Sequence, residues 1–243
     1  MASPPLAGAD VLALQEKLDL LGFAPGPLDG VYGVATESAV RAFQRAHGLE
    51  PDGIVGPLTR GALRRERRPR SSRALRRTPS EIGQRALAEA VRHIGVKERP
   101  RGSNRTPFGR WFGVDGIPWC NVFLSYCFAV GAKHVICAGF AGAGVYPKGC
   151  TYVPTTEAWL RTTGMWAGRT APLPGDIAVF NWDGGPSDHV GIVEAAVDAG
   201  RFHCIEGNTA PGRDSNGGEV QRRLRYLGQV TGFGRVVRSR AGV

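Results

Sequence analysis

The sequence predicts an α+β protein, in which a small three-helix N-terminal module precedes a larger domain with an antiparallel sheet. Apolar residues recur at helical spacing near the N-terminus and again between residues 80 and 130, whereas from residue 175 they alternate with period two. Helices followed by strands within one domain are typical of the α+β class. At about 150 residues per domain, a chain of 243 residues has room for one or two domains.

The N-terminal module, predicted over residues 8–64, begins with a helix that Gly22 ends. Two similar segments follow, DGVYGVAT at residues 29–36 and DGIVGPLT at residues 52–59, and both fit the pattern D-G-x-x-G-x-x-T. Asp-Gly favours a tight turn, the second glycine suits a helix N-cap, and Pro57 suits a first helical position. We therefore expect three helices, the last two each preceded by the same kind of turn. The apolar face of the first helix consists of Val11, Leu14, Gln15, Leu18 and Leu21.

An arginine-rich stretch follows this module. The formal net charge of +10 suggests a polyanionic partner, but residues 64–77 contain eight Arg and one Glu and so carry about seven of the ten charges. Charge of one sign resists packing, so residues 65–78 are predicted to form an exposed linker. The linker either attracts anionic wall polymer or a membrane surface, or is a plain solvated tether. A nucleic-acid tail is a third interpretation, which the lack of aromatic residues in the stretch disfavours.

The composition gives no sign of a membrane protein. The chain is 42% hydrophobic and 21% charged, as in an ordinary globular protein. The longest stretch without a charge or His covers residues 116–132 and is shorter than the roughly 20 residues that a spanning helix needs. Asp10 interrupts the apolar N-terminal stretch and no basic residue precedes Lys17, which makes a poor secretory signal. We expect that the protein is made in the cytoplasm and that it does not insert stably into a membrane.

The chain has five cysteines, an odd number, and none of them forms a CxxC pair. This pattern disfavours both a zinc site and a disulfide scaffold. We expect a reduced protein with one nucleophilic cysteine and no metal or other cofactor. A bridge between Cys137 and Cys150 is the alternative.

The first helix of the C-terminal domain, which is predicted over residues 79–240, has a clear start signal. Thr78 is predicted to cap it, Pro79 to take the first position and Glu81 to complete a capping box, and Gly95 ends it. An apolar stripe along this helix supports the assignment and consists of Ile82, Ala86, Leu87, Ala90, Val91 and Ile94.

A second helix carries the candidate nucleophile. Its apolar residues recur at helical spacing from Trp119 to Val130, and Cys120 falls at its start. A cysteine at a helix N-terminus faces unpaired backbone N–H groups and the positive end of the dipole, and both favour the reactive thiolate. The alternative is a small buried residue, a description that fits Cys127 well.

The strands predict how polar residues meet this cysteine. A hairpin that turns near residues 198–200 sets His189 opposite Glu206 or within a few residues of it, and side-chain alternation puts Glu206 and Asn208 on one face. A helix bearing Cys120 on that face would complete a Cys–His–carboxylate/amide site for nucleophilic catalysis. The predicted strands are Ile177–Phe180, His189–Glu194, Arg201–Glu206, Gln221–Arg225 and Gly232–Val237. Spacing alone does not choose among the five histidines, which also include His47, His93, His134 and His203.

Residues 8–64 resemble the peptidoglycan-binding domain of many cell-wall hydrolases, through LQEKLDLLGF and GPLDGVYGVATESAVRAFQRAHGLEPDGIVGPLT. The resemblance implies that the module holds glycan or stem peptide in a shallow groove near its turns. The alternative is that the matching residues only build turns and core. These residues, the candidate substrate-binding set of the module, are Asp29, Gly30, Phe43, Gln44, Asp52 and Gly53.

Residues 80–238 resemble the CHAP family of papain-like cysteine peptidoglycan amidases and endopeptidases, through PWCNVFLSYC, PLPGDIAVFNWDGGPSDHVGIVEA, FHCIEGNT and GFGRV, in that order. The resemblance implies that Cys120 is the nucleophile, that His189 is the general base and then the acid, and that Glu206 orients the imidazole. It makes Asn208 the fourth polar member, and it suggests that the backbone N–H of Cys120 contributes to the oxyanion hole.

The sequence departs from the family in two ways. Asn121 follows the nucleophile where the family usually has a small or acidic residue, which could alter a subsite. Only Asp115 is acidic between Arg99 and Cys120, so we do not predict the calcium site that some relatives have. Asn104, in the approach to the nucleophile, is a candidate substrate contact, and a turn role is the alternative.

We therefore expect a monomeric two-domain peptidoglycan hydrolase that cuts either the muramoyl–L-alanine amide or a peptide bond. The lack of a signal peptide favours a phage endolysin that reaches the wall after release, and a secreted bacterial autolysin is the alternative. A non-catalytic wall-binding protein and a nucleic-acid-binding protein are the hypotheses from other classes.

Overall fold

The computed structural model describes residues 8–21, 23, 25–26, 28–66, 78–169, 171–182, 185–210, 212 and 216–238. The chain divides into two compact units, residues 1–73 and 74–243. The predicted linker falls largely on residues 67–77, which lie outside the described residues, as does the predicted helix terminator Gly22. None of the helices in the described ranges is long and apolar enough to cross a membrane.

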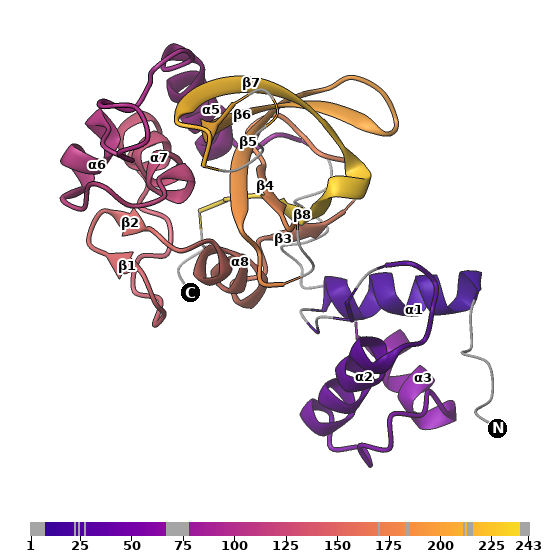
Figure 1. The fold of residues 1–243 in the computed structure, drawn as a ribbon. Coiled ribbons are helices and arrows are strands. Elements are labelled where there is room, and N and C mark those ends of the chain that lie inside the picture. Colours follow the sequence, from indigo (N-terminus) through magenta and orange to yellow (C-terminus); the bar gives the residue numbers. More distant parts are fainter. Residues whose placement is uncertain are drawn as a thin grey trace. The chain divides into compact units, whose positions relative to one another are not determined.

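The described part of the N-terminal unit contains three helices, α1 (Ala9–Leu20), α2 (Val34–Ala46) and α3 (Pro57–Arg65), which Figure 1 labels. Gly33 and Gly56 are the N-caps of α2 and α3, and Pro57 is the first residue of α3, all as predicted. The small apolar core between the helices consists of Leu18, Ala39, Val40, Phe43, Ala62 and Leu63.

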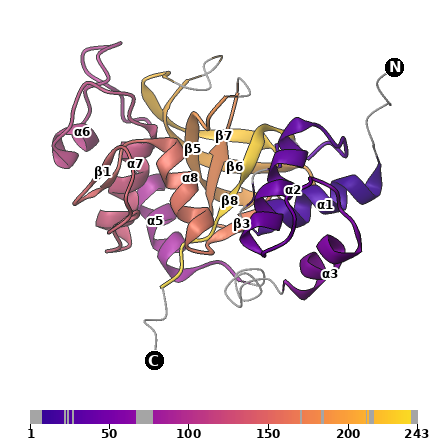
Figure 2. The ribbon, with the colours of Figure 1, turned by 90° about the horizontal axis from the view of Figure 1, so that it is seen from below.

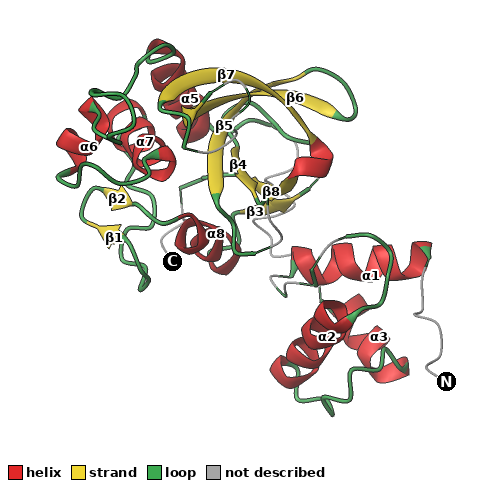
Figure 3. Ribbon diagram, viewed as in Figure 1, coloured by secondary structure: helices red, strands yellow, loops and turns green. Residues whose placement is uncertain are grey.

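The C-terminal unit contains a six-stranded antiparallel sheet in the order β3-β8-β4-β5-β6-β7. Figure 3 shows this sheet as the main strand-containing layer, with helices beside it. The α+β class with an antiparallel sheet is therefore confirmed. The strands are β3 (Trp166–Gly168), β4 (Ile177–Phe180), β5 (His189–Ala196), β6 (Arg201–Thr209), β7 (Glu219–Tyr226) and β8 (Val230–Gly234).

Figures 1 and 2 show the helices of this unit on one side of the curved sheet. A core of apolar residues from these helices and from alternate strand positions such as Val179, Val190 and Ile205 joins the two layers. The intervening strand positions form a second core on the other face, which includes Phe180, Val193 and Cys204. The remaining elements are α5 (Glu81–Arg92), α6 (Pro107–Phe112), α7 (Cys120–Tyr126), the π-helical turn η1 (Cys127–Gly131), β1 (Val145–Tyr146), β2 (Gly149–Cys150), α8 (Val153–Thr162) and the 3₁₀ turn η2 (Leu227–Gln229).

Two predicted ends are wrong. The first helix of this unit is capped by Ser80, whose side chain accepts a hydrogen bond from the backbone N–H of Gly83, and not by Thr78. The helix ends at Arg92, before Gly95, because the backbone N–H of Gly95 donates instead to the carbonyl of Val220 in β7. A contact distant in the sequence thus overrides a local end signal.

The last predicted strand also differs, since β8 ends at Gly234 and not at Val237. Beyond it the backbone N–H of Arg235 donates to the carbonyl of Met165, and its guanidinium forms a buried bidentate pair with Asp176. After the strand ends, this ion pair connects the chain beyond β8 to the loop before β4. We call the pair of Asp176 and Arg235 the clamp.

All five cysteines are free thiols, which agrees with the expected reduced protein and not with a Cys137–Cys150 bridge. The two thiols nevertheless interact. A hydrogen bond from Cys137 lowers the pKa of Cys150 to about 6, whereas that bond and burial raise the pKa of Cys137.

Candidate active site

Cys120 is the first residue of α7 and follows Trp119, the N-cap residue, whose side chain makes no capping hydrogen bond. The first backbone N–H groups of a helix have no partner within the helix, so the thiol lies at the positive end of α7. The side chain is largely buried, with 7% of the residue exposed. The helix packs against the sheet at Gly207 of β6, where an added Cβ would lie 2.8 Å from the side chain of Phe123.

His189 is the first residue of β5 and is fully buried. Alternation along the strand puts it on the sheet face opposite the helices, beside Phe180, because its neighbour Val190 belongs to the core under the helices. Glu206 of β6 lies on the same face, and its Oε2 is 3.0 Å from Nε2 of His189. The predicted His–carboxylate pair is therefore formed in the structure.

The thiol of Cys120 lies against this imidazole. Burial lowers the pKa of His189, but hydrogen bonding and charge interaction with Cys120 and Glu206 outweigh it and raise the pKa to about 9. Because Nε2 is held by Glu206, Nδ1 is the nitrogen left for the thiol, and it has no aligned hydrogen-bond partner among the described residues. Loosely aligned catalytic hydrogen bonds are common in proteins without bound substrate. Only the first residue of α7 lies near the ring, at the edge of the sheet where β5 begins. The helix does not pack on the sheet face that holds His189.

Glu206 has a second partner that the sequence did not indicate. Arg225 of β7 is buried and donates from Nε to Oε1 at 2.7 Å and from its terminal nitrogen to Oε2 at 2.5 Å. Burial raises the pKa of Glu206, but the hydrogen bonds and charges of Arg225 and His189 outweigh it, so that the net shift is downward. The carboxylate is therefore held ionised in the interior.

Aromatic rings cover this charged cluster. The guanidinium of Arg225 lies 4.9 Å from the ring centroid of Trp182 and 5.4 Å from that of Phe180, and the two rings are stacked. The ring of His189 is 5.8 Å from Phe180 and 6.3 Å from Trp182. Such walls keep water from the ion pairs and strengthen their interaction.

Asn208 does not join His189. Its amide donates to the side chain of Asn216 at 3.3 Å, and its side-chain oxygen accepts the backbone N–H of Gly218 at 3.2 Å. The reason lies in the backbone, since the pairing of β6 with β7 shifts register between Glu206 and Thr209, and Asn208 has a left-handed φ of 60°. This bulge interrupts the alternation from which we placed Asn208 beside Glu206.

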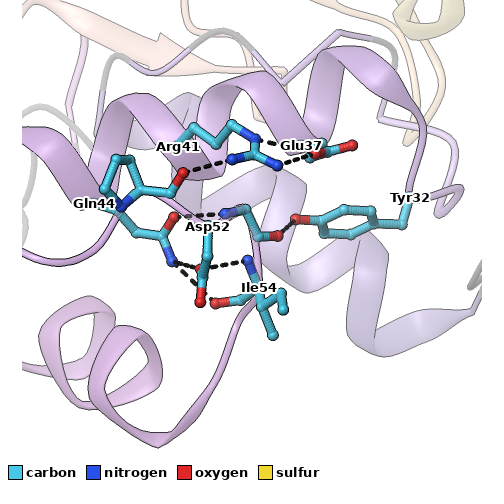
Figure 4. A network of polar contacts seen from close by, with 8 residues as sticks. Tyr32, Glu37, Arg41, Gln44, Asp52 and Ile54 are labelled. Atoms are coloured by element: carbon cyan, nitrogen blue, oxygen red, sulfur yellow. Dashed lines mark hydrogen bonds and ion pairs between the residues drawn. The ribbon is translucent and has the colours of Figure 1, made fainter.

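In the N-terminal unit the candidate binding residues form hydrogen bonds with one another. Figure 4 shows the side-chain amide of Gln44 between the second turn and α2. Its nitrogen donates to Asp52 Oδ1, to the carbonyl of Ile54 and to the hydroxyl of Thr59, and its oxygen accepts the backbone N–H of Gly53 at 2.9 Å. All of its polar groups are thus used within the module.

The first turn repeats this arrangement with a different glutamine. The Gln15 nitrogen donates to Asp29 Oδ1, to the carbonyl of Val31 and to the hydroxyl of Thr36, and its oxygen accepts the backbone N–H of Gly30 at 2.9 Å. The motif D-G-x-x-G-x-x-T therefore describes one hydrogen-bonded unit, in which the final Thr accepts from a glutamine of the preceding helix. The motif did not reveal Gln15, which lies 14 residues before Asp29.

The two aspartates and Phe43 also have structural partners. Hydrogen bonds from the backbone N–H of Val31 and from Gln15 lower the pKa of Asp29, and those from Ile54 and Gln44 lower that of Asp52. Phe43 is fully buried and stacks on His47, with ring centroids 4.0 Å apart.

Residues 7–63 match the model of the family described as "Putative peptidoglycan binding domain", and residues 112–208 match that of the CHAP domain. The chain carries a peptidoglycan-binding domain and a CHAP domain. Cys120, His189, Glu206 and Asn208 all lie within the matched part of the CHAP domain, whereas Arg225 lies beyond it.

Several relatives match a stretch about as long as the peptidoglycan-binding domain. The N-acetylmuramoyl-L-alanine amidase CwlM of Mycobacterium tuberculosis is 48% identical over 59 residues, 24% of this chain and 14% of that protein. A spore cortex-lytic enzyme of Oceanobacillus iheyensis is 46% identical over 56 residues, 23% of this chain and 20% of that enzyme. The chain thus covers no more than a fifth of either relative. A solved structure, the crystal structure of Ly7917, is similar with a TM-score of 0.36 and 19% identity over 62% of this chain and 61% of that chain.

Asn104, upstream of α7, belongs to a tight loop of the CHAP domain. It has a left-handed φ of 56°, and its backbone N–H donates to Glu98 Oε2 at 2.9 Å. The same carboxylate accepts the backbone N–H of Gly102, and the two residues that flank the loop, Arg99 and Arg105, join through a backbone hydrogen bond. These contacts fit the turn role, the alternative to substrate contact.

Proposed function

We propose that the protein hydrolyses an amide bond in peptidoglycan with Cys120 as the nucleophile. The observation that carries the proposal is the buried imidazole of His189, held at Nε2 by Glu206 and in contact with the thiol at the N-terminus of α7. The two domain matches support peptidoglycan as the partner, through the N-terminal domain, and as the substrate.

In the proposed reaction the thiol proton moves to Nδ1 of His189, and the sulfur attacks the carbonyl carbon of the scissile amide. The carbonyl electron pair moves to oxygen, where the backbone N–H of Cys120 would stabilise the negative charge. When the tetrahedral intermediate collapses, the C–N bond breaks and the leaving nitrogen takes the proton from His189.

The thioester is then hydrolysed. His189 accepts a proton from water, the hydroxide attacks the thioester carbonyl, and the C–S bond breaks to release a carboxylic acid and restore the thiol. Glu206 stabilises the imidazolium in both steps and fixes which ring nitrogen faces the sulfur.

The scissile bond is either the muramoyl–L-alanine amide or a peptide bond of the stem or cross-bridge. The names of two relatives, the N-acetylmuramoyl-L-alanine amidases CwlM of Mycobacterium tuberculosis and CwlL of Bacillus licheniformis, favour the first. We propose a phage endolysin that is made in the host cytoplasm and acts at the wall after release, with a secreted bacterial autolysin as the alternative. We also propose that it acts as a monomer.

Mass spectrometry of purified peptidoglycan after digestion tests the proposal. Wild type should release fragments with a new amine and a new carboxylate, whose identity names the bond, while Cys120→Ala should release none. Cys127→Ala is the matched control, because Cys127 is a buried thiol that directly follows α7 and is not among the groups that act on His189, and it should retain activity. Failure of wild type on walls of several chemotypes would instead favour the non-catalytic wall-binding hypothesis.

A further inference from the structure

Arg225 is a buried cation for which the proposed reaction has no step. It enters the site from β7, the edge strand of the sheet, and its guanidinium donates two nearly parallel hydrogen bonds to Glu206. The Oε2 atom of Glu206 is shared, since it also faces Nε2 of His189 at 3.0 Å. The carboxylate is thus fixed in one plane by the arginine, with one oxygen directed at the imidazole.

The planar guanidinium of Arg225 contributes a fixed geometry to this arrangement as well as charge. Arg binds a carboxylate bidentately, whereas Lys binds as a point charge that leaves the carboxylate free to rotate. The aromatic rings of Phe180 and Trp182 lie over the guanidinium and limit its own movement. An added Cβ at Gly191 of β5 would lie 2.6 Å from Cγ of Glu206, so the carboxylate has little space on the side away from the arginine.

A second buried arginine–carboxylate pair beside the same sheet allows a comparison with the pair of Arg225 and Glu206. Asp176 and Arg235 form the same bidentate contact at 2.7 and 2.6 Å, and both side chains are as buried as those of Glu206 and Arg225. This pair lies at the end of the sheet where β8 meets the loop before β4, and within the described part of the chain no histidine hydrogen-bonds to it. It offers a matched structural pair that does not touch the candidate site.

We propose that Arg225 is a positioning residue, which acts through Glu206 to orient the imidazole of His189 toward the thiol of Cys120 and to stabilise its imidazolium form. The inference rests on the proposed function, because it assigns a role within that same site. Arg225 itself touches neither the thiol nor any reacting atom, so it is not a catalytic residue.

The groups that act on this centre come from four elements. They are Cys120 of α7, His189 of β5, Cys204 and Glu206 of β6, and Arg225 of β7. Helix α5 also packs against β5 and β6, but its acid Glu89 pairs with Arg92 and His93 of the same helix. Arg225 therefore brings a permanent positive charge to Glu206 from the neighbouring strand β7.

Loss of Arg225 should change the site in a defined direction. Without the guanidinium, burial favours the protonated form of Glu206, and a neutral carboxyl no longer stabilises the imidazolium. The pKa of His189 should then fall, so that a smaller fraction of the imidazole is charged beside Cys120. Each unit by which this pKa falls changes the protonation equilibrium of the ring about tenfold.

The test is the rate of Cys120 alkylation by iodoacetamide as a function of pH, in the full-length protein, with Cys120→Ala as the blank. Arg225→Met should react about tenfold or more slowly at neutral pH, and its alkylation rate should reach its plateau at a higher pH than in wild type. Arg225→Lys should recover much of the alkylation rate, because it keeps the charge, but not the full hydrolytic rate, because it lacks the fork.

Two controls separate positioning from folding. Arg235→Met also leaves a buried carboxylate without its arginine, so it should lower the melting temperature like Arg225→Met while leaving the alkylation profile unchanged. The double variant Glu206→Gln, Arg225→Met removes both charges and should recover melting temperature without recovering the alkylation profile.

The outcomes distinguish this inference from the proposed function. If Arg225→Met keeps the wild-type alkylation profile, or reacts faster than wild type at neutral pH, the positioning role is overturned even where wild type digests peptidoglycan. If wild type digests no peptidoglycan but the alkylation profile moves to higher pH in Arg225→Met and not in Arg235→Met, the proposed function fails and the positioning role stands.

Discussion

The two domains use buried polar side chains in opposite ways. In the peptidoglycan-binding domain, each polar atom of the Gln15 and Gln44 amides has a partner within the module. In the CHAP domain, His189 is held at Nε2, while its Nδ1 is buried beside a thiol without an aligned partner among the described residues.

This difference shows how to weigh motif residues. A buried group costs free energy unless it is hydrogen-bonded, so a fully satisfied network is explained by folding alone. Folding does not explain a buried nitrogen that has no hydrogen-bond partner and lies next to a nucleophile. A catalytic role would explain it. The aspartates and glutamines of the binding domain are therefore explained by turn building, whereas we propose Cys120 and His189 as the reactive centre.

The largest expected effect is on activity. Cys120→Ala should lower peptidoglycan hydrolysis by about 10³-fold or more, because no other nucleophile lies against His189. The melting temperature should change little, since Ala fills most of the space of a small side chain at the start of α7. Turbidity loss of a cell-wall suspension measures the activity, and appreciable residual hydrolysis would remove the contrast between the two domains.

The second effect is on stability as a function of pH. The pKa of His189 is raised to about 9 from an ordinary value of 6.5, so its charged form stabilises the folded state below about pH 6.5. That contribution, up to about 3 kcal/mol, should be lost as the pH rises from 6.5 towards 9.

Denaturant unfolding of the full chain at several pH values measures this loss. Glu206→Gln removes the carboxylate that holds the ring, and the decrease in stability over this pH range should then be much smaller. Gln15→Ala should leave the decrease as it is in wild type. A wild-type stability that rises between pH 6.5 and 9 would contradict the assigned ion pair.

The third effect concerns the satisfied networks. Gln44→Ala leaves the backbone N–H of Gly53 without its acceptor and removes three donated bonds, which should destabilise the binding domain by about 1–3 kcal/mol. Hydrogen exchange of α2 and α3 amides within the full chain reports the loss. Gln84→Ala is the matched control, because that exposed glutamine makes one long bond of 3.4 Å.

The smallest effect is expected at the turn aspartates. Asp52→Ala removes the acceptor for the backbone N–H of Ile54 but leaves the amide of Gln44 with two further acceptors, so it should destabilise the domain less than Gln44→Ala. Co-sedimentation with peptidoglycan should stay near the wild-type level if Asp52 only builds the turn. A large loss of co-sedimentation with unchanged hydrogen exchange would make Asp52 a ligand contact.

Much of the fold and part of the site follow from local sequence. The strand Ile177–Phe180 has the predicted bounds, Cys120 begins its helix, and the count of residues around the hairpin brought His189 to Glu206. These features depend on periodicity, on a helix start signal and on one short turn, each of which lies within a few residues.

Features that depend on distant contacts could not be predicted. Alternation in β7 suggests that Leu224 is buried and Arg225 exposed, but the reverse holds because Glu206 needs a partner. The polar residues at positions 221, 223 and 225 were the one available signal of a polar inner face. Asn208 was misplaced by a bulge, and β3 was missed because its pairing partner is β8, far along the chain.

The glutamine bonds of the binding domain also bear on the order in which the chain folds. Gln15 of α1 holds the turn that leads into α2, and Gln44 of α2 holds the turn that leads into α3. Each helix thus secures the start of the next with contacts that span at most 21 residues, whereas the clamp between Asp176 and Arg235 spans 59. Local contacts form fast and synthesis runs from the N-terminus. The peptidoglycan-binding domain should therefore fold on the ribosome before the strands of the CHAP domain have been made.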